Sequence, residues 1–369
     1  MNDLKHICLA TLSIVFLPQL TVRAASSEFV VETVAGNGQP GDTTEGKARA
    51  TSVDQPFGVE CGPDGGLYIT SVGSHRVLRL DRKTGELTSV AGSGAKGYSG
   101  DGGQAIEALL NEPYEVRFDS TGHYMYFVEM KNHLIRRVDL HTGIISTIAG
   151  DPRGGYAGDG GSASGALFRQ PHSIALDDKG HLYVADIGNH RIRRIDLAAG
   201  TIDAIAGNGE KKLPRDGSLA QGQPILGPRA LYVVGDAMWI ALREGNSVWR
   251  LDLESGRIHH VAGTGRKGFS GDGGDPLEST FNGPKGIAAT PEGIVYVMDT
   301  ENQAVRRIDT HAGRIETIAG GGPHARGFAG EDAPALDAKF DRPHGICLDP
   351  DGSLYVGDTN NHRVRWIHR

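Results

Sequence analysis

The sequence predicts an all-β protein, a six-bladed β-propeller with four antiparallel strands in each blade. Three observations lead to this fold class. Glycine fills 54 of the 369 positions, roughly twice its usual share, which favours many tight turns. Apolar residues make up 38% of the chain, enough to bury a core and to exclude wholesale disorder. Three sequence markers recur six times at intervals of about 57 residues, a period typical of repeat folds.

The recurring markers are an Ala-Gly pair that ends a β-branched run, a proline that opens an apolar run, and an aromatic residue further along. The glycines of the pairs are Gly36, Gly92, Gly150, Gly207, Gly263 and Gly320. The prolines are Pro56, Pro113, Pro171, Pro228, Pro284 and Pro343. The aromatic residues are Tyr68, Tyr126, Tyr183, Trp239, Tyr296 and Tyr355. Because the three series agree in spacing, they define six structural units.

The third unit shows most clearly the four strands expected in each blade, here named a to d in chain order. They cover residues 173–176, 181–185, 191–195 and 201–205, and turn-forming residues separate them. Radial closure of six such units shortens and protects the sheet edges that a row of isolated sheets would leave open.

The two ends of the chain predict how the ring closes. Residues 29–34 have the pattern of a strand d, and the last unit stops at strand c, residues 363–367. We therefore expect the N-terminal strand to complete the sixth blade. A linear solenoid is the alternative, but it needs polar capping repeats, and the sequence shows none.

The N-terminus has the features of a signal peptide. Lys5 and His6 precede an apolar run at residues 7–17, and Val22 and Ala24 are the small residues expected before a cleavage site. Residues 1–24 are therefore predicted to be removed and residues 25–369 to form one propeller domain. The run is too short to span a bilayer. We expect an exported protein, periplasmic, cell-surface or secreted, without stable membrane insertion.

Charge and cysteine content narrow the class of protein further. The net charge of −7 becomes −8 when the predicted signal peptide is removed, which opposes nucleic-acid binding. Cys8 leaves with that peptide, so Cys61 and Cys347 remain. Two cysteines in an exported chain of this length do not make a disulfide framework, and buried free thiols or a single bridge are both compatible with the sequence.

The segment from strand b to strand c resembles the NHL repeat, which is named after an Asn-His-Leu triplet. Residues 183–196 read YVADIGNHRIRRID, residues 355–367 read YVGDTNNHRVRWI, and residues 132–134 are the triplet itself. The resemblance covers residues 29–369 and implies a six-bladed propeller. It says little about chemistry, because this fold carries both binding proteins and enzymes.

Several polar residues repeat in the same place in each unit, which indicates a scaffold role. The acids that end strand b, Glu129, Asp186, Asp299 and Asp358, are expected to accept backbone N–H groups and fix a turn. The histidines after them, His75, His133, His190 and His362, are expected to link neighbouring blades by hydrogen bonds. The adjacent arginines of strand c, such as Arg136 and Arg137, are expected on a solvated outer surface.

Each connection from strand d to the next strand a is about twenty residues long and rich in glycine. It carries the pattern Gly-aromatic-small-Gly-acid, as at residues 97–101, 155–159 and 268–272. An apolar residue three before the proline, such as Phe168, is expected to pin this loop onto the blade. One carboxylate per loop, Asp101, Asp159 or Asp272, is too few for a calcium cage of the EF-hand type.

The residue directly after each strand-a proline is the candidate site. We call these six positions the axial slot, because strand a lines the channel of a propeller. They are Phe57, Tyr114, His172, Arg229, Lys285 and His344. Almost everything around the slot repeats, whereas the slot itself does not. A variable loop position without a ligand is the alternative interpretation; polar, titratable variety at one channel mouth favours a binding site.

Two functions from different classes fit this slot. The first is a non-catalytic binding scaffold for a small molecule, glycan, peptide or protein, acting as a monomer. The second is a metal-assisted hydrolase or lyase with His172 and His344 as metal ligands and a zinc or calcium ion as cofactor. The Pro-His segments at 171–172 and 343–344 resemble those of the zinc-dependent peptidyl-hydroxyglycine amidating lyase, but the slot lacks a third imidazole. A carboxylate and amide set like that of calcium-dependent gluconolactonases is missing from the slot.

Overall fold

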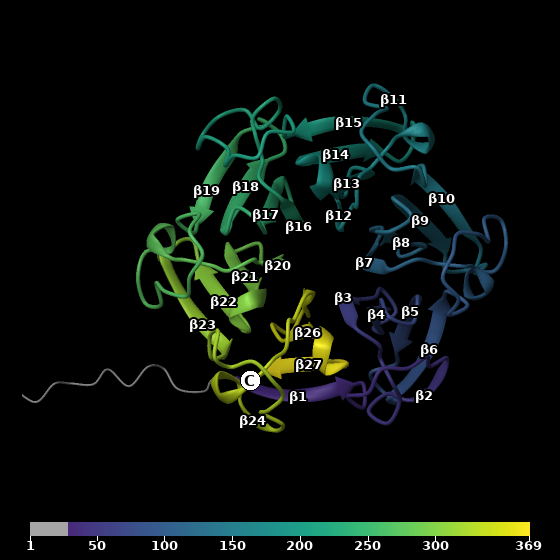
Figure 1. Cartoon of the computed structure of the whole chain (residues 1–369), viewed down its shortest axis with the longest axis horizontal. Helices are drawn as coiled ribbons and strands as arrows, with labels where there is room; N and C mark the ends of the chain where they lie inside the picture. Colours follow the sequence, from purple (N-terminus) through teal and green to yellow (C-terminus); the bar gives the residue numbers. More distant parts are fainter. Residues whose placement is uncertain (1–28) are drawn as a thin grey trace, which may run out of the picture.

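Six blades surround a central axis in the computed structural model, which describes residues 29–369 (Figure 1). The predicted signal peptide lies outside the described residues. Strands a of neighbouring blades contact one another all the way around the ring. The predicted fold class, with antiparallel strands ordered a to d from the axis outward, is confirmed. The helices of the described part are 3-10 turns of three residues, none of which is long enough to cross a membrane.

The strands of the first three blades are as follows. Blade 1 contains β3 (Pro56–Cys61), β4 (Leu67–Ser71), β5 (Arg76–Leu80) and β6 (Glu86–Ala91). Blade 2 contains β7 (Pro113–Phe118), β8 (Tyr124–Glu129), β9 (Leu134–Asp139) and β10 (Ile145–Gly150). Blade 3 contains β12 (Ser173–Leu176), β13 (His181–Asp186), β14 (Arg191–Asp196) and β15 (Thr201–Ala206), within one residue of the predicted bounds.

The remaining blades complete the circle. Blade 4 contains β16 (Pro228–Val234), β17 (Ala237–Leu242), β18 (Ser247–Asp252) and β19 (Ile258–Ala262). Blade 5 contains β20 (Gly286–Ala289), β21 (Ile294–Asp299), β22 (Ala304–Asp309) and β23 (Arg314–Gly320). Blade 6 contains β25 (Ile346–Leu348), β26 (Leu354–Asp358), β27 (Arg363–His368) and, from the other end of the chain, β1 (Val30–Ala35).

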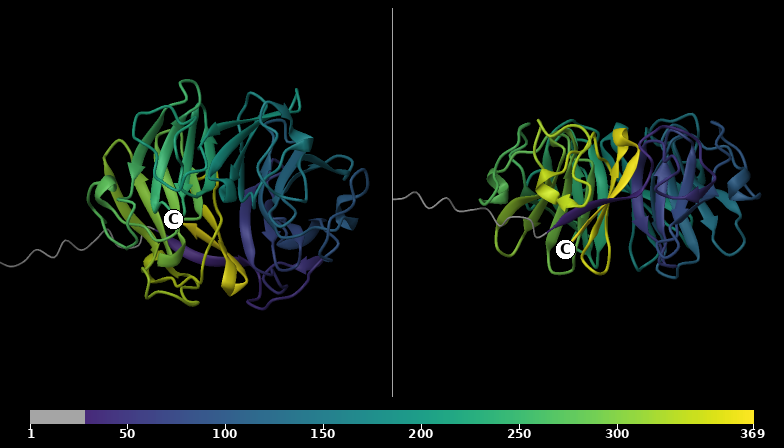
Figure 2. Two further views of the ribbon diagram at one scale, coloured as in Figure 1. Left: turned by 45° about the horizontal axis from the view of Figure 1, so that its top comes forward. Right: turned by 90° about the horizontal axis from the view of Figure 1, so that it is seen from below.

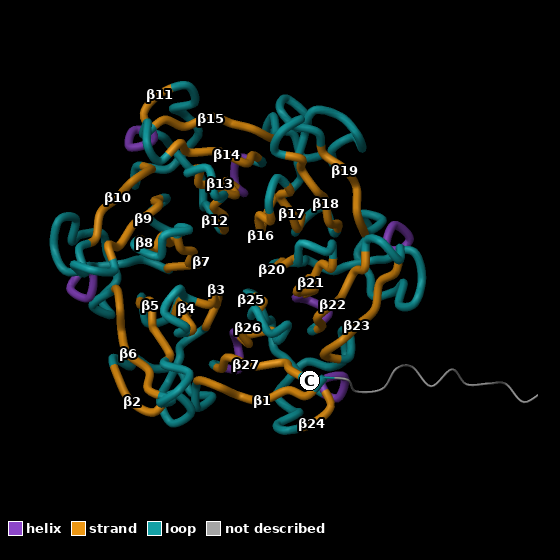
Figure 3. Tube along the Cα trace, turned by 180° about the vertical axis from the view of Figure 1, so that it is seen from behind, coloured by secondary structure: helices purple, strands orange, loops and turns teal. Residues whose placement is uncertain are grey.

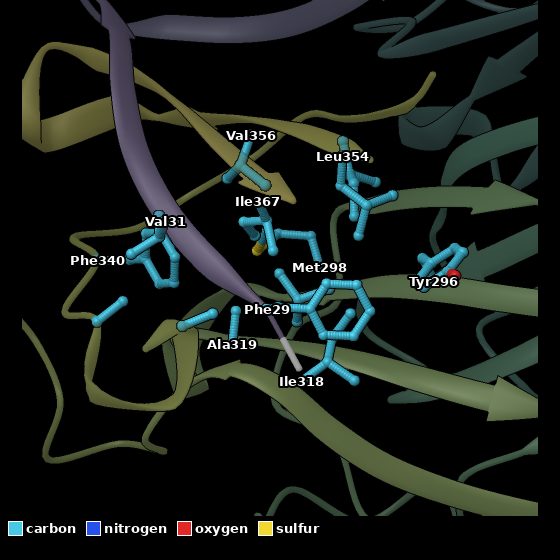
Figure 4. Close-up of a cluster of buried hydrophobic side chains, with 14 of the residues drawn as sticks. Phe29, Val31, Tyr296, Met298, Ile318, Ala319, Phe340, Leu354, Val356 and Ile367 are labelled. Atoms are coloured by element: carbon cyan, nitrogen blue, oxygen red, sulfur yellow. The ribbon is translucent and has the colours of Figure 1, made fainter. Parts of the chain in front are cut away.

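The ring closes as predicted, because β1 pairs antiparallel with β27 (Figure 2). Phe29 and Val31 are buried with Phe340 and Ile367 in one cluster between blades 5 and 6 (Figure 4). Five similar clusters fill the other blade interfaces, so the core of the protein is a set of interfaces between sheets. Each blade buries its apolar surface only against its neighbours, and the ring depends on every junction.

At every junction, a backbone N–H of the next blade donates a hydrogen bond to the side chain at the position where the sequence repeats histidine. Glu112 N–H donates to His75 Nδ1 (3.3 Å), and Gln170 N–H donates to His133 Nδ1 (3.0 Å). In two blades an amide oxygen replaces the imidazole, at Asn246 and Gln303. The other two bonds are accepted by His190 and His362. The predicted role as linkers between blades is confirmed.

The same residues explain the Ala-Gly pairs, through a contact between strands c and d of one blade. Gly92 has φ of +91°, and a Cβ atom there would lie 2.2 Å from the carbonyl oxygen of His75. The equivalent distance from Gly207 to the carbonyl of His190 is also 2.2 Å. Glycine is therefore required because both the backbone conformation and the close approach exclude a side chain.

A buried network of acid and arginine supports four of the six blades. Arg306 on β22 is fully buried and lies between Asp299 (3.7 Å), at the end of β21, and Asp272 (2.8 Å), in the preceding d-to-a loop. Asp299 also accepts the backbone N–H of Asn282 (2.7 Å) and the side-chain amide of Asn302 (2.7 Å). The equivalent arginines are Arg136, Arg193 and Arg365, also fully buried.

This network confirms the scaffold role of the strand-b acids and corrects the prediction for the arginines. The first arginine of each adjacent pair is buried and ion-paired, and is not on a solvated surface. In blades 1 and 4, Ser71 and Leu242 replace the acid, and Leu78 and Trp249 replace the arginine. Acid and arginine are thus present or absent together, as expected because either alone is a costly buried charge.

The long d-to-a loops run along the outer edge of the blade that follows them (Figure 3). In three blades they add a short fifth strand to the predicted four, namely β2 (Glu45–Lys47), β11 (Gly161–Ser162) and β24 (Ala333–Pro334). In blade 2 the loop makes equivalent backbone bonds between Gly102, Gly103 and Ile145. Phe168 and its equivalents are buried beneath the loops. The loops therefore cover strand edges that would otherwise invite pairing with other chains.

Truncation tests the closure. Removal of residues up to Ala35 deletes β1 and leaves the edge of β27 and the buried cluster exposed, so we expect a large fall in melting temperature or failure to fold. A chain beginning at Phe29 is the control. Equal melting temperatures for the two chains, measured by circular dichroism, would contradict the closure.

Substitution of Arg306 tests the buried network. Arg306→Met leaves Asp299 as an unpaired buried carboxylate, and we expect a loss of about 3–5 kcal/mol in the free energy of unfolding. Adding Asp299→Leu, the residue that blade 4 has in this place, should recover part of that loss. Urea titration measures both; an unchanged stability of the single variant would show that the network contributes nothing.

The histidine linkers predict a pH dependence. An Nδ1 atom that accepts an N–H must be unprotonated, and burial lowers the pKa of His75, His133 and His190. The unfolded chain therefore binds these protons first, so their contribution to stability is present above pH ~6.5 and is lost as the pH falls below that value.

Burial raises the pKa of the carboxyls of Asp186, Asp299 and Asp358 to about 7, so their contribution to the pH dependence of stability has the opposite sign. A histidine variant separates the two effects. We expect the variant with Gln at positions 75, 133 and 190 to lose less melting temperature than the natural chain between pH 8 and pH 5.5. Gln303 already occupies the equivalent linker position in blade 5, with the same positive φ. Parallel melting curves would refute the assignment.

Candidate functional site

The axial slot lies at the start of strand a in each blade, and the structure brings its side chains together around the axis. Five of the six are joined by contacts between rings or between a ring and a cation. The sixth, Lys285, makes no such contact among the described residues; its charge nevertheless acts on Arg229, His172 and His344. His172, Arg229, Lys285 and His344 are buried, whereas Phe57 and Tyr114 are half-buried.

Aromatic rings form one side of the slot, on blades 6, 1, 2 and 3. The ring of Phe57 stacks on His344 with centroids 3.9 Å apart and lies 4.4 Å from the ring of Tyr114. Tyr114 in turn meets His172 edge-on at 4.9 Å. Burial raises the pKa of Tyr114, so its hydroxyl stays protonated at neutral pH.

Cationic side chains form the other side, on blades 4 and 5. Lys285 Nζ pairs with Glu301 (2.7 Å), which also meets Arg342 (3.4 Å). Burial lowers the pKa of Lys285 to about 8, although Glu301 opposes the shift. Arg229 lies over the ring of Tyr114 at 5.5 Å, and burial lowers its pKa to about 10. The slot therefore has an aromatic side and a positively charged side.

Both histidines of the slot have their tautomer fixed by a neighbour. His172 Nδ1 lies 2.6 Å from the carbonyl oxygen of Gln170, which can only accept, so Nδ1 carries the proton. His344 Nδ1 lies 2.8 Å from the hydroxyl of Thr359, which itself donates to the carbonyl of Pro56 (2.7 Å). Burial holds the pKa of both imidazoles well below the usual value. Each is a neutral ring with an Nε2 lone pair.

The residues of the slot do not make a complete zinc site. A catalytic zinc requires three protein ligands, and the slot offers two imidazoles from opposite blades. Across residues 29–369, no group of three or more His, Cys, Asp or Glu side chains is arranged to hold a metal ion. The loop acids Asp101, Asp159 and Asp272 are engaged by buried arginines.

A second polar cluster lies at the opposite end of strand a. Arg117 pairs there with Glu60 (3.1 Å) and Glu115, beside a cavity of about 280 Å³ that Tyr232 also lines. Burial raises the pKa of Glu60 to about 7. Cys61 and Cys347 are both free, and their thiols are 3.2 Å apart at the junction of blades 1 and 6. The two acids are thus held by one arginine, and no axial slot residue belongs to this cluster.

Sequence reasoning missed the charged neighbours of the slot. Glu301 and Glu244 come from the loop between strands b and c, two residues after the strand-b acid or its replacement. Arg342 directly precedes a strand-a proline. These places also do not repeat: the equivalents of Glu301 include Gly73, Lys131 and Asn360. The same search for non-repeating positions would have found them.

Comparison with known proteins agrees with the repeat assignment. The family model described as NHL repeat matches residues 168–195 and 340–367. The chain contains NHL repeats. The first match covers all but the last residue of the stretch 183–196, and the second covers the stretch 355–367. NHL repeat-containing protein 2 of Gallus gallus is 30% identical over 282 residues, covering 69% of this chain and 38% of that protein.

The relatives are longer proteins, and this chain spans between 27% and 44% of the length of four curated ones. Among solved structures, an auxiliary nutrient binding protein from Bacteroides thetaiotaomicron superposes with a TM-score of 0.66 at 17% identity, covering 92% of this chain and 76% of that one. A gluconolactonase from Xanthomonas campestris gives 0.56 at 12% identity, covering 86% of each chain. At these identities the similarity shows the fold of the NHL-repeat propeller and not its chemistry.

Proposed function

We propose that this chain is an exported, monomeric NHL-repeat propeller that binds a small molecule, glycan, peptide or protein at its loop-rich face, with the axial slot as the binding site. One observation supports this above all others. Six side chains that do not follow the repeat converge at the axis of a scaffold that otherwise repeats.

The contrast with the repeated residues gives this observation its weight. The repeated histidines bind the next blade, and the repeated acids and arginines pair within a blade and its preceding loop. Among the described residues, the Arg229 side chain has no ion pair, and Phe57 and Tyr114 are half-buried. The predicted export signal and the mature charge of −8 support a ligand other than a nucleic acid. A structural neighbour described as a nutrient binding protein is in keeping with this function.

A ligand screen tests the proposal. We expect that a thermal-shift screen of residues 25–369 against monosaccharides, oligosaccharides, short peptides and organic acids finds at least one class that binds. Tyr114→Ala should weaken that binding at least tenfold, because it removes an aromatic contact surface. Tyr98→Ala, an exposed aromatic on an outer loop, is the matched control. If all hits bind the Tyr114 variant as tightly as the natural chain, the slot is not the site.

The alternative, a metal-assisted hydrolase or lyase, is favoured by one detail of the slot. The Nδ1 protons of His172 and His344 are held by oxygen acceptors, the arrangement that leaves Nε2 available to a metal ion. Two ligands alone do not complete the site, so we derive no reaction step from it. Elemental mass spectrometry of tag-free protein decides: about one equivalent of zinc or calcium, lost on His172→Ala, would favour the enzyme and start a screen of lactones, esters and amides.

A further inference from the structure

Arg229 is a buried cation without a counter-ion. The residue is only 4% exposed to solvent. Among the described residues it forms no ion pair, no side-chain hydrogen bond is donated by its guanidinium, and its Nε atom is completely buried without a partner. Its guanidinium lies over the face of the Tyr114 ring, 5.5 Å from the ring centroid. An uncompensated buried charge is strongly unfavourable, so an arginine in this state needs an anion.

The carboxylates that act electrostatically on Arg229, Glu115 and Glu244, already have other partners. Glu244 pairs with Arg243, and Glu115 pairs with Arg117. Glu301 is shared by Lys285 and Arg342. On the side of blades 4 to 6, four cations therefore face two carboxylates, Glu244 and Glu301. Arg229 is the one of these four cations without an ion pair, and Lys285, the other cation of the axial slot, shares Glu301 with Arg342.

The opposite side of the slot favours a flat apolar group. Phe57 and Tyr114 are half-buried, and their ring centroids lie 4.4 Å apart with the ring planes at 49° to each other. Arg229 touches Tyr114 directly, so a cation and an aromatic surface adjoin. The neutral His172 and His344, with their Nε2 lone pairs, add hydrogen-bond acceptors between the two sides.

We propose that the axial slot binds a planar organic anion, a carboxylate or a phosphate monoester attached to an unsaturated ring, with the oxyanion held by Arg229 and Lys285 and the ring against Phe57 and Tyr114. This inference rests on the proposed function and narrows its ligand class. An arginine fork matches both oxyanions in bidentate geometry, and a desolvated charged hydrogen bond is among the stronger single contacts available.

Titration calorimetry on residues 25–369 with benzoate, phenyl phosphate and neutral benzamide tests the proposal. We expect at least one anion to bind at least tenfold more tightly than benzamide, and the order of benzoate and phenyl phosphate identifies the oxyanion. Arg229→Met should weaken binding of the anion at least tenfold. Lys285→Met should weaken binding less, because Lys285 is already paired with Glu301. Arg266→Met, at an exposed loop position, should change nothing.

The unliganded protein gives a second readout that a structural role would not give. Removal of an unpaired buried charge stabilises the empty protein, so Arg229→Met should raise the melting temperature by a few degrees. Arg306→Met, which breaks a paired network, should lower it. A lower melting temperature or misfolding of the Arg229 variant would show a structural arginine and overturn the proposal.

Failure of this inference can be told apart from failure of the proposed function. Equal binding of benzamide and benzoate, or anion binding that survives Arg229→Met, overturns the anion site and leaves a Tyr114-dependent ligand from the screen intact. Absence of binding by all three probes also overturns it; the proposed function falls as well only if the screen finds no Tyr114-dependent ligand.

Discussion

The close approach of successive blades is the constraint on which the rest of this structure depends. At each junction a residue with positive φ presents its side-chain acceptor to the backbone of the next blade. Within its own blade the carbonyl of the same residue faces the glycine at the end of strand d. The side-chain bond joins two sheets whose facing surfaces form the buried apolar clusters. The sixfold Ala-Gly series is the trace in the sequence of the contact between strands c and d of one blade. A side chain at any of these glycines would push strand d away from strand c and displace the residue that links to the next blade.

Much of this architecture could be predicted from the sequence because the same markers occur in all six units. Blade number, strand order and the pairing of β1 with β27 all follow from the register of the three markers. The burial of Arg136 and its equivalents could not be predicted in the same way. Arg136 and Arg137 are adjacent in the sequence, and nothing local shows that one of them points toward an acid 35 residues earlier. The paired loss of acid and arginine in blades 1 and 4 was the available signal.

The position of the candidate site could be predicted from the sequence, but the pairing of its charges could not. The proline register placed the six axial residues, and the structure brings five of them into contact. Whether a charge is paired depends on residues from other loops, such as Glu301 and Arg342, whose distance in sequence carries no information about their distance in space. The separation into an aromatic and a cationic side therefore emerges only when the ring is closed. A scaffold of similar blades carries an asymmetric slot because the residue after the strand-a proline does not follow the repeat.

The pairing of β1 with β27 also sets when the ring can close during synthesis. Residues 30–35 are synthesised long before their partners at 363–368. At the usual rate of translation, β1 waits on the order of 20–70 seconds for that partner. Val31, Thr33 and Ala35 have their buried face unprotected throughout this interval. The ring can therefore close only after residues 363–368 have been made, and until then β1 is an open edge that other chains can join.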